Sequence, residues 1–126
     1  MEPERDTPAP LILLVEDDLS VREALTFALK IEGFAVEVHD RAESLLEHLE
    51  PLSAACLVLD HHLPGLSGAE ALVELRRRGL SCPAILITTQ PKPPVRNAAA
   101  KLGALILEKP LLGGELPAAI RELLGR

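Results

Sequence analysis

The stretch LVLDHHLPGLSG, residues 57–68, contains the change of pattern that decides the fold. Its apolar start belongs to the run ACLVL, residues 55–59, and a continuous apolar run suits a strand covered on both faces of a sheet. The run ends abruptly in Asp60, and a Pro-Gly pair marks the following turn. Residues 68–79 then read GAEALVELRRRG, a helix that Gly79 ends. Strand, turn and helix make one β–α unit.

The same unit recurs along the whole chain. The other predicted strands are LILLV (11–15), FAVEV (34–38), AILIT (84–88) and ALIL (104–107). A helical pattern follows each strand, and residues 20–33 are expected to start with Ser20 as N-cap and Glu23 as its capping-box partner. Asp40 and Glu43 have the same spacing before the next helix. Five β–α units predict an α/β fold, a doubly wound five-stranded parallel sheet with helices on both faces.

Length and composition restrict the class of protein. The 126 residues suit one domain, which we expect at residues 10–126 behind a disordered N-terminal lead, residues 1–9. The net charge of −6 disfavours direct binding of nucleic acid. No apolar run reaches the roughly 18 residues of a membrane span, so we expect a soluble cytoplasmic protein that does not contact the membrane. Cys56 and Cys82 are expected as buried small hydrophobes.

Chemically active residues follow several of the predicted strands. Ligands of open parallel sheets bind at the carboxyl ends of the strands. Those ends carry Glu16-Asp17-Asp18, Asp60, Thr88-Thr89 and Glu108-Lys109-Pro110. Crowded carboxylates repel one another unless a cation joins them, and oxygen ligands favour Mg²⁺. With Lys109 to pair with a phosphate, Asp60 is the expected nucleophile and would form an aspartyl phosphate.

The segments LILLVEDD, LVLDHHLPGLSG, AILITT and LEKP occur in this order along the chain. Over about residues 10–124 the sequence therefore resembles the receiver domain of two-component response regulators, which has a CheY-like fold. The stretch EGFAVEVHDRAESLLEHL is similar to the subgroup that includes the nitrogen-fixation regulators. The resemblance implies the flavodoxin-like strand order 2-1-3-4-5.

The resemblance also implies roles for single residues in phosphorelay signal transduction. The Mg²⁺ ligands would be Glu16, Asp17, Asp60 and the backbone carbonyl of His62. Asp60 would be the phosphoacceptor, and its donor would be a phosphohistidine on a sensor histidine kinase or a histidine phosphotransfer protein. Thr88 would be the switch hydroxyl, and Lys109, followed by Pro110 with its frequent cis bond, would pair with the phosphate. Such a phosphoprotein catalyses its own phosphorylation and dephosphorylation but is no turnover enzyme, and its downstream protein partner stays undefined.

Three departures from the family pattern bear on switching. Thr89 stands where a small residue is usual, and Ile106 stands where an aromatic or histidine side chain is usual. Residues 90–97 read QPKPPVRN, and their prolines are expected to stiffen the loop before the fourth helix.

His62 lies two positions after the acceptor, where side chains tune the access of water, so its imidazole is expected to make the phosphoryl lifetime sensitive to pH near neutrality.

Several alternatives remain at this point. A non-phosphorylated receiver-like scaffold for protein interaction is the second reading, and a Mg²⁺-dependent phosphatase is disfavoured because EDD contains no DxD pair after the first strand. A dedicated metal site at His61 and His62 is disfavoured because no third His or Cys lies nearby in sequence. The alanines at 98–100 can serve a homodimer contact or pack on the sheet. The chain is either a natural single-domain regulator, which we favour, or a receiver cut from a longer protein.

Overall fold

The computed structural model describes residues 8–48, 54–111 and 113–125. Most of the expected N-terminal lead, residues 1–7, lies outside the described residues. The five strands are β1 (Leu11–Val15), β2 (Ala35–His39), β3 (Cys56–Asp60), β4 (Ala84–Thr88) and β5 (Ala104–Glu108). All neighbouring strands pair in parallel, in the order β2-β1-β3-β4-β5. The predicted strand order is therefore confirmed.

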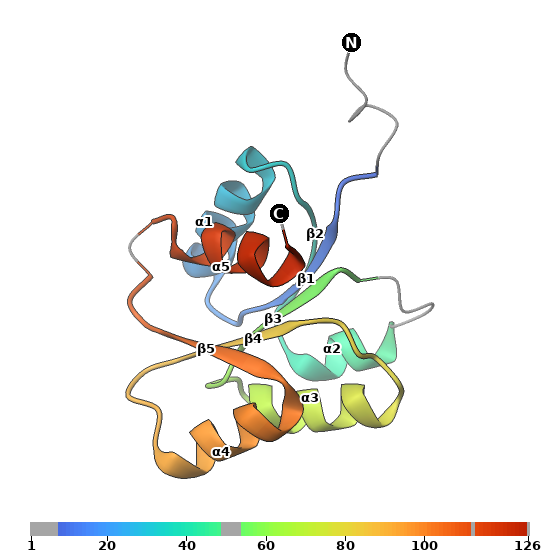
Figure 1. Cartoon of the computed structure of the whole chain (residues 1–126), viewed down its shortest axis with the longest axis vertical. Coiled ribbons are helices and arrows are strands. Elements are labelled where there is room, and N and C mark those ends of the chain that lie inside the picture. The colour runs from blue at the N-terminus through green and yellow to red at the C-terminus, as the bar shows by residue number, and fades with distance from the viewer. Residues whose placement is uncertain (1–7, 49–53, 112, 126) are drawn as a thin grey trace.

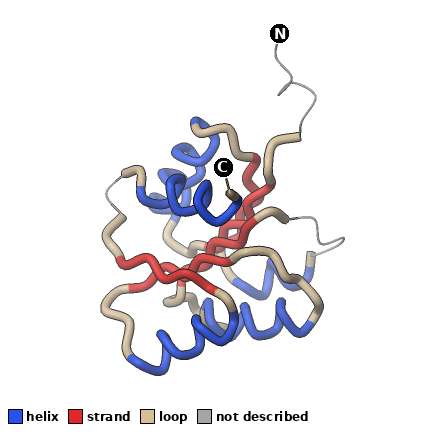
Figure 2. Tube along the Cα trace, in the orientation of Figure 1, coloured by secondary structure: helices blue, strands red, loops and turns tan. Residues whose placement is uncertain are grey.

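Helices cover both faces of this sheet, as Figures 1 and 2 show. The helices are α1 (Leu19–Ile31), α2 (Ala42–Glu47), α3 (Gly68–Arg77), α4 (Pro93–Leu102) and α5 (Glu115–Leu124). The helices α1 and α5 pack on one face, and α2, α3 and α4 lie on the other (Figure 1). Because every strand runs in the same direction, all five carboxyl ends meet at one edge of the sheet.

The start of α1 differs from the prediction. Asp18, not Ser20, is the N-cap, and its side chain accepts the N–H of Val21 at 3.0 Å. The Asp18 carboxylate has the better position because the chain leaves the sheet there in an extended conformation, with φ −81° and ψ 119°. Ser20 already lies in the first turn of the helix, so its expected capping box with Glu23 does not form.

The predicted cap of α2 is also wrong. Its N-cap is Arg41, which makes no side-chain capping bond, and Glu43 bonds a distant loop instead of Asp40. A capping box does occur at α3, where Ser67 and Glu70 bond each other's backbone N–H. Ser67 and Glu70 have the S-x-x-E spacing of a capping box, so the sequence contains the signal for it.

Aliphatic side chains fill both layers between sheet and helices. One cluster, which includes Leu13, Leu57 and Leu86, lies on the face covered by α2, α3 and α4. The other, which includes Ile12 and Ile85, lies under α1 and α5. The strands β3 and β4 are buried along their whole length, whereas the outer strands β2 and β5 are partly exposed. The central strands therefore hold the sheet edge that carries Asp60 and Thr88.

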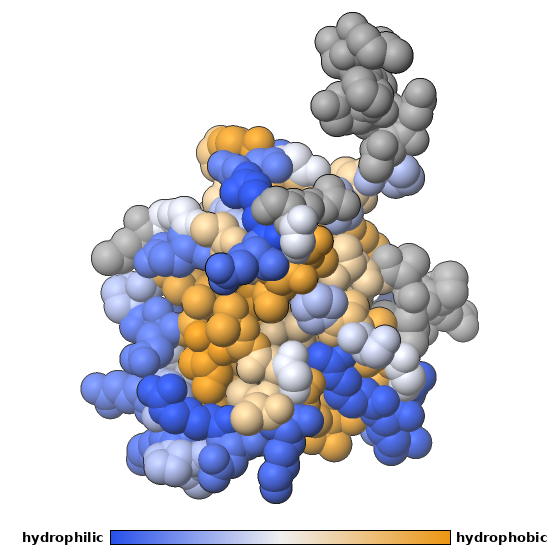
Figure 3. Space-filling model, viewed as in Figure 1, coloured by the Kyte–Doolittle hydropathy of each residue, from blue (hydrophilic) through white to orange (hydrophobic). Residues whose placement is uncertain are grey.

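The surface of the molecule mixes charged and apolar side chains. Figure 3 shows an apolar band across the front of the molecule, where β5 lies, and Leu105 on that strand is 38% exposed. Ala99 is buried within the protein, so this part of the 98–100 segment packs inward. In the part of the chain that the structure describes, no helix is long and apolar enough to cross a membrane.

Candidate functional site

The carboxyl ends of the three central strands bury polar side chains. Glu16, which follows β1, is 1% exposed, Asp60 at the end of β3 is 2% exposed, and Thr88 at the end of β4 is 1% exposed. The Glu16 N–H donates to the carbonyl of His39 at 3.0 Å, which extends the β1–β2 pairing by one residue. Burial of charged or hydroxyl groups is costly without partners. Their shared location therefore marks a candidate site.

Three carboxylates converge at this edge. Glu16, Asp17 and Asp60 each place one oxygen so that these atoms all lie within 4.8 Å of one another. Burial raises the pKa of Glu16 to about 7, the N–H of Asp18 opposes this, and the negative charge of Asp60 adds to it. The second Glu16 oxygen, Oε1, is buried and has no hydrogen-bond partner among the described residues. A buried carboxylate oxygen without a partner, beside two other acids, fits a hard divalent cation.

Lys109 supplies a positive charge to the same place. Its Nζ lies 2.9 Å from Oδ2 of Asp60 and donates a hydrogen bond to it. Partial burial lowers the pKa of Lys109, but the hydrogen bond that it donates to Asp60 and the charges of the three acids outweigh this effect, and the net pKa is raised. The lysine is therefore ionised at neutral pH. An ammonium beside a buried carboxylate can bind the oxygens of a phosphoryl group at Asp60.

The loop after β3 holds the other Asp60 oxygen. The His62 N–H donates to Oδ1 of Asp60 at 2.9 Å, and the His61 N–H continues the sheet to Ile87 at 2.8 Å. Gly68 begins α3 directly beneath the acceptor, and a Cβ at this position would lie 2.4 Å from the carbonyl oxygen of Asp60. Only glycine permits this close approach. The acceptor backbone, the loop and α3 therefore form one tightly packed unit.

The ring of His62 contacts the hydroxyl of Thr88 at the end of β4. His62 Nε2 lies 3.0 Å from Oγ1 of Thr88 and 3.5 Å from Oγ1 of Thr89. Its ring meets that of His61 edge-on at a centroid distance of 5.2 Å. His62 is exposed, whereas His61 is partly buried. Burial lowers the pKa of His61, and the neighbouring His62 acts in the same direction. The His62–Thr88 contact joins residues 26 positions apart, so no local pattern announced it.

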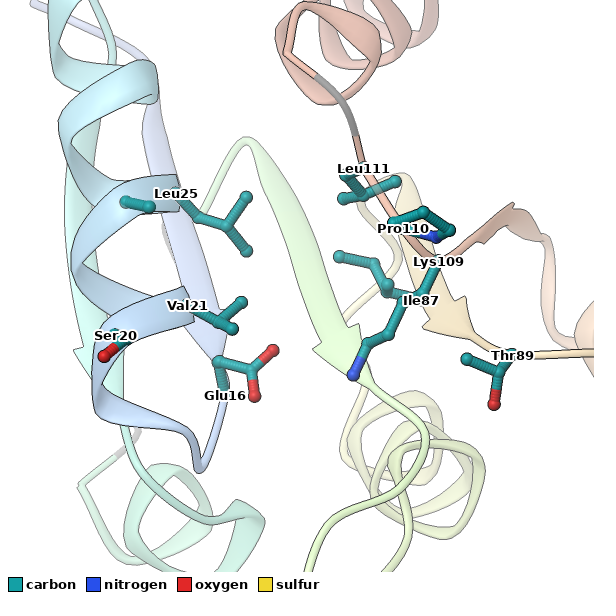
Figure 4. Close-up of a pocket in the computed structure, with 10 residues that line it drawn as sticks. Glu16, Ser20, Val21, Leu25, Ile87, Thr89, Lys109, Pro110 and Leu111 are labelled. Carbon is teal, nitrogen blue, oxygen red and sulfur yellow. The ribbon is translucent and has the colours of Figure 1, made fainter.

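A cleft of about 570 Å³ opens beside the acids, between α1 and the chain that follows β5. Figure 4 shows the carboxylate of Glu16 and the ammonium of Lys109 directed toward this cleft from opposite walls. Val21, Leu25 and Leu111 line its apolar part. The bond between Lys109 and Pro110 is cis. The cleft gives solvent and small molecules a path to the charged groups at the sheet edge.

Comparison with known proteins identifies the family. The sequence model of the response regulator receiver domain family matches residues 12–121, which lie within the predicted domain, residues 10–126.

The chain belongs to the response regulator receiver domain family.

A receiver domain is part of a signalling protein rather than a turnover enzyme, and it implies a cognate histidine kinase. The acidic cluster Glu16, Asp17 and Asp60 is typical of the magnesium site of receiver domains.

Individual relatives agree with this assignment. The chain is 41% identical over 114 residues to the transcriptional regulatory protein FixJ of Azorhizobium caulinodans, an alignment of 90% of this chain and 54% of that protein. Full-length FixJ from B. japonicum matches with a TM-score of 0.84 and 34% identity, over 94% of this chain and 59% of that one. A CheY-like receiver from Methanospirillum hungatei has a TM-score of 0.87 at 24% identity, over 94% and 95% of the two chains, which supports the fold alone. The chain spans about half the length of the curated relatives it matches.

The residues predicted from sequence are brought together to different degrees. Glu16, Asp17, Asp60, Thr88 and Lys109 all lie at the carboxyl edge of the sheet. Ile106 lies further back, partly buried in β5 opposite Leu86 of β4, whereas Thr88 lies opposite Glu108. Asp18 caps α1 and is not part of the acidic cluster. Among the described residues the three-acid cluster contains no histidine or cysteine.

Proposed function

We propose that Asp60 accepts a phosphoryl group from a phosphohistidine and that this modification changes a protein-binding surface of the domain. The supporting observation is the placement of a buried Asp60 between two other carboxylates and the Lys109 ammonium, at 2.9 Å from Nζ. The donor would be the cognate histidine kinase or a histidine phosphotransfer protein. Such donors act in the cytoplasm, so the proposal includes a cytoplasmic location.

In the proposed reaction an Asp60 carboxylate oxygen attacks the phosphorus atom of the donor. The phosphorus–nitrogen bond to the donor histidine breaks, its electron pair stays on the nitrogen, and a proton from solvent neutralises the leaving imidazolate. Lys109 loses its present bond to Asp60 Oδ2 and pairs with the oxygens of the transferred group. Little covalent chemistry is required of the protein, so positioning and charge supply most of the rate.

The acidic cluster would hold Mg²⁺ during this reaction. Glu16, Asp17, Asp60 and the carbonyl of His62 are the proposed ligands, and the buried Oε1 of Glu16 is an oxygen that still needs a partner. When bound, Mg²⁺ offsets the negative charge of the carboxylates and of the phosphoryl oxygens. The cation would also stabilise Glu16 in its ionised form, against the effect of burial on its pKa.

The switch in this proposal is the hydroxyl of Thr88. It lies 3.0 Å from His62 Nε2, so a bond from Thr88 to the phosphoryl group requires this contact to break. Thr89 and His62 together narrow the approach to Asp60 and are the proposed modulators of phosphorylation and hydrolysis rates. Ile106 has no ring to exchange between inner and outer positions, so a smaller change is expected at β5. The downstream partner and any homodimer are part of the proposal only as users of this changed surface.

Mass spectrometry of the intact protein after incubation with acetyl phosphate tests the proposal. We expect a gain of one phosphoryl group in the presence of Mg²⁺, and no gain with a chelator or in the Asp60→Ala variant. Asp40→Ala is the matched control, because Asp40 is an exposed acid outside the acidic cluster, and it is expected to react like the parent. Absence of labelling with acetyl phosphate and with a panel of phosphorylated kinases would favour the scaffold alternative.

A further inference from the structure

Glu43 makes a contact that its position in the sequence does not suggest. It lies in the first turn of α2, yet its Oε2 accepts the N–H of Leu66 at 3.0 Å, across 23 positions of sequence. Leu66 belongs to the loop between Asp60 and α3, residues 61–67, which we call the acceptor loop. A carboxylate of α2 therefore holds the backbone of the loop that follows the phosphoacceptor.

The fit between Glu43 and the loop is close. Gly65 has φ +73°, and a Cβ at this position would lie 2.4 Å from Oε2 of Glu43. The other oxygen, Oε1, is fully buried and has no partner among the described residues. The N–H of Leu66, and then the N–H of Glu43 itself, hold the pKa of this carboxyl below its ordinary value. The ionised carboxylate is thus enclosed against the Gly65–Leu66 peptide.

The other backbone hydrogen bonds that the structure shows for the acceptor loop lie at its two ends. At the start, the N–H groups of His61 and His62 bond Ile87 and the Asp60 side chain. At the end, Ser67 takes part in the capping box of α3, and the Gly68 N–H donates to the carbonyl of His61 at 3.1 Å. The Glu43 carboxylate adds a hydrogen bond from outside the loop, to the N–H of Leu66 just before Ser67.

We propose that Glu43 is a positioning residue that orients the acceptor loop, so that the His62 carbonyl faces the acidic cluster and sets the affinity of the site for Mg²⁺. This inference rests on the proposed function, since it assigns the His62 carbonyl to the cation. Glu43 touches neither the acidic cluster nor the reacting atoms. Its removal is therefore expected to weaken Mg²⁺ binding and to leave phosphorylation at saturating Mg²⁺ nearly unchanged.

Calorimetric titration of the unphosphorylated chain with Mg²⁺ tests this role. For Glu43→Ala we expect about 5-fold weaker binding, somewhat less than the loss typical of residues that bond a metal ligand directly. Glu43→Gln keeps an oxygen that can accept the Leu66 N–H, and its affinity is expected to stay close to that of the parent. Glu47→Ala is the matched control, because Glu47 is an exposed acid on the same helix, and it is expected to bind as the parent does.

A second variant approaches the same contact from the loop. Gly65→Ala displaces the Glu43 carboxylate, since the added Cβ occupies its place. If both residues act through one contact, the double variant Glu43→Ala/Gly65→Ala loses less affinity than the two single losses predict when added as free energies. Circular dichroism establishes that each variant is folded before it is titrated. Should Glu43→Ala not fold, Gly65→Ala and Glu43→Gln still give the comparison.

The outcomes separate the two proposals. Parent-like Mg²⁺ affinity in folded Glu43→Ala, or strictly additive losses in the double variant, overturns the role of Glu43 and leaves the proposed function standing. A parent chain that takes up no Mg²⁺ and gains no phosphoryl group at Asp60 overturns both. Weaker Mg²⁺ binding in Glu43→Ala, rescued by glutamine and by high Mg²⁺ in the phosphorylation assay, supports the role of Glu43.

Discussion

The two halves of the carboxyl edge of the sheet are built differently. On the β1–β3 half, Glu16 and Asp60 are buried, and the acceptor loop is hydrogen-bonded at its start, at Leu66 and at its end. On the β4–β5 half, the N–H groups of Thr89 and Gln90 have no acceptor within the part of the chain that the structure describes, and Gln90 has a positive φ of 43°. Lys109 there is 28% exposed.

The two halves suit two different tasks: the β1–β3 half holds its oxygens in place, and the β4–β5 half lets a side chain change partners. A cation and an acceptor require oxygens at fixed distances, which a tightly bonded loop provides. A hydroxyl that changes partners requires a backbone with few competing bonds, and these are the segments with low local stability. Residue His62 joins the halves, since its backbone belongs to the acceptor loop and its ring contacts Thr88. Four changes would test how far the two halves are independent.

The largest effect is expected from Gly68→Ala, which disturbs the packing of the β1–β3 half. Its Cβ would lie 2.4 Å from the Asp60 carbonyl oxygen and 2.9 Å from a methyl group of Leu86. We expect a loss of about 3 kcal/mol in the free energy of unfolding, because neither backbone nor core can yield cheaply. Urea denaturation measures this. Gly114→Ala, where a Cβ meets no atom within 4 Å, is the control, and equal losses in both variants would contradict the close packing beneath Asp60.

The free energy of unfolding of the metal-free protein is expected to depend on pH because of Glu16. Its pKa is raised from 4.5 to about 7 in the folded state, so the folded chain binds more protons than the unfolded chain between these values. Stability is therefore fully present below about pH 4.5 and falls as the pH rises to about 7, by at most about 3 kcal/mol. Denaturation midpoints at several pH values, with a chelator present, measure the fall.

Two comparisons isolate the contribution of Glu16. Glu16→Gln is expected to remove the fall, because glutamine does not titrate, whereas Glu47→Gln on the exposed face of α2 is expected to keep it. Addition of Mg²⁺ is expected to reduce the fall in the parent, since the cation stabilises the ionised carboxylate. A parent and a Glu16→Gln variant with parallel pH profiles would show that the buried glutamate is not the cause.

His62→Ala tests the connection between the halves. Loss of one side-chain hydrogen bond, worth about 1 kcal/mol, is expected to speed amide hydrogen exchange in residues 89–92 by about 5-fold. The acceptor loop keeps its own backbone bonds and is expected to exchange as before. Exposed His48 provides the control variant, His48→Ala. Unchanged exchange in residues 89–92 would mean that the Thr88 contact does not restrain this loop.

The smallest effect on stability is expected for Pro94→Ala, next to the β4–β5 half. Pro94 lies in the first turn of α4, where proline fits the helix, so the change is expected to cost less than about 1 kcal/mol. Chemical shifts on phosphorylation are expected to change little across α4, β5 and α5 in the parent and more in the variant. Pro8→Ala, at an exposed position before β1, is the control. Large changes throughout this face in the parent would refute a stiffened loop.

The sequence predicted the elements of the fold better than their ends. LILLV and AILIT coincide with β1 and β4 to the residue, because continuous apolar runs bounded by polar residues leave little freedom in placing a buried strand. The cap of α1 was missed because several capping side chains compete between residues 17 and 20. Which of them caps the helix depends on the backbone direction where the chain leaves the sheet, and no local pattern encodes that direction.

The candidate site shows the same division. Acids, hydroxyl and lysine could be placed at one edge because parallel strands bring their carboxyl ends together. The contacts of His62 with Thr88 and of Glu43 with Leu66 could not, since they join residues 26 and 23 positions apart and depend on how loops from different units pack. A glutamate in capping-box spacing predicted a local role for Glu43, and tertiary packing gave it a distant one.

The bond between Asp60 and Lys109 joins residues 49 positions apart and has a consequence for how the chain matures. Lys109 follows β5, which within the described residues lies at one side of the sheet and pairs with β4. During synthesis the carboxylates leave the ribosome well before the lysine that neutralises them, and pairing of distant segments is a slow step of folding. A nascent or half-folded chain therefore has the carboxylates of the site but lacks the Lys109 ammonium beside Asp60. We expect the ability to take up a phosphoryl group to appear only after β5 has paired with β4 and Lys109 has reached Asp60.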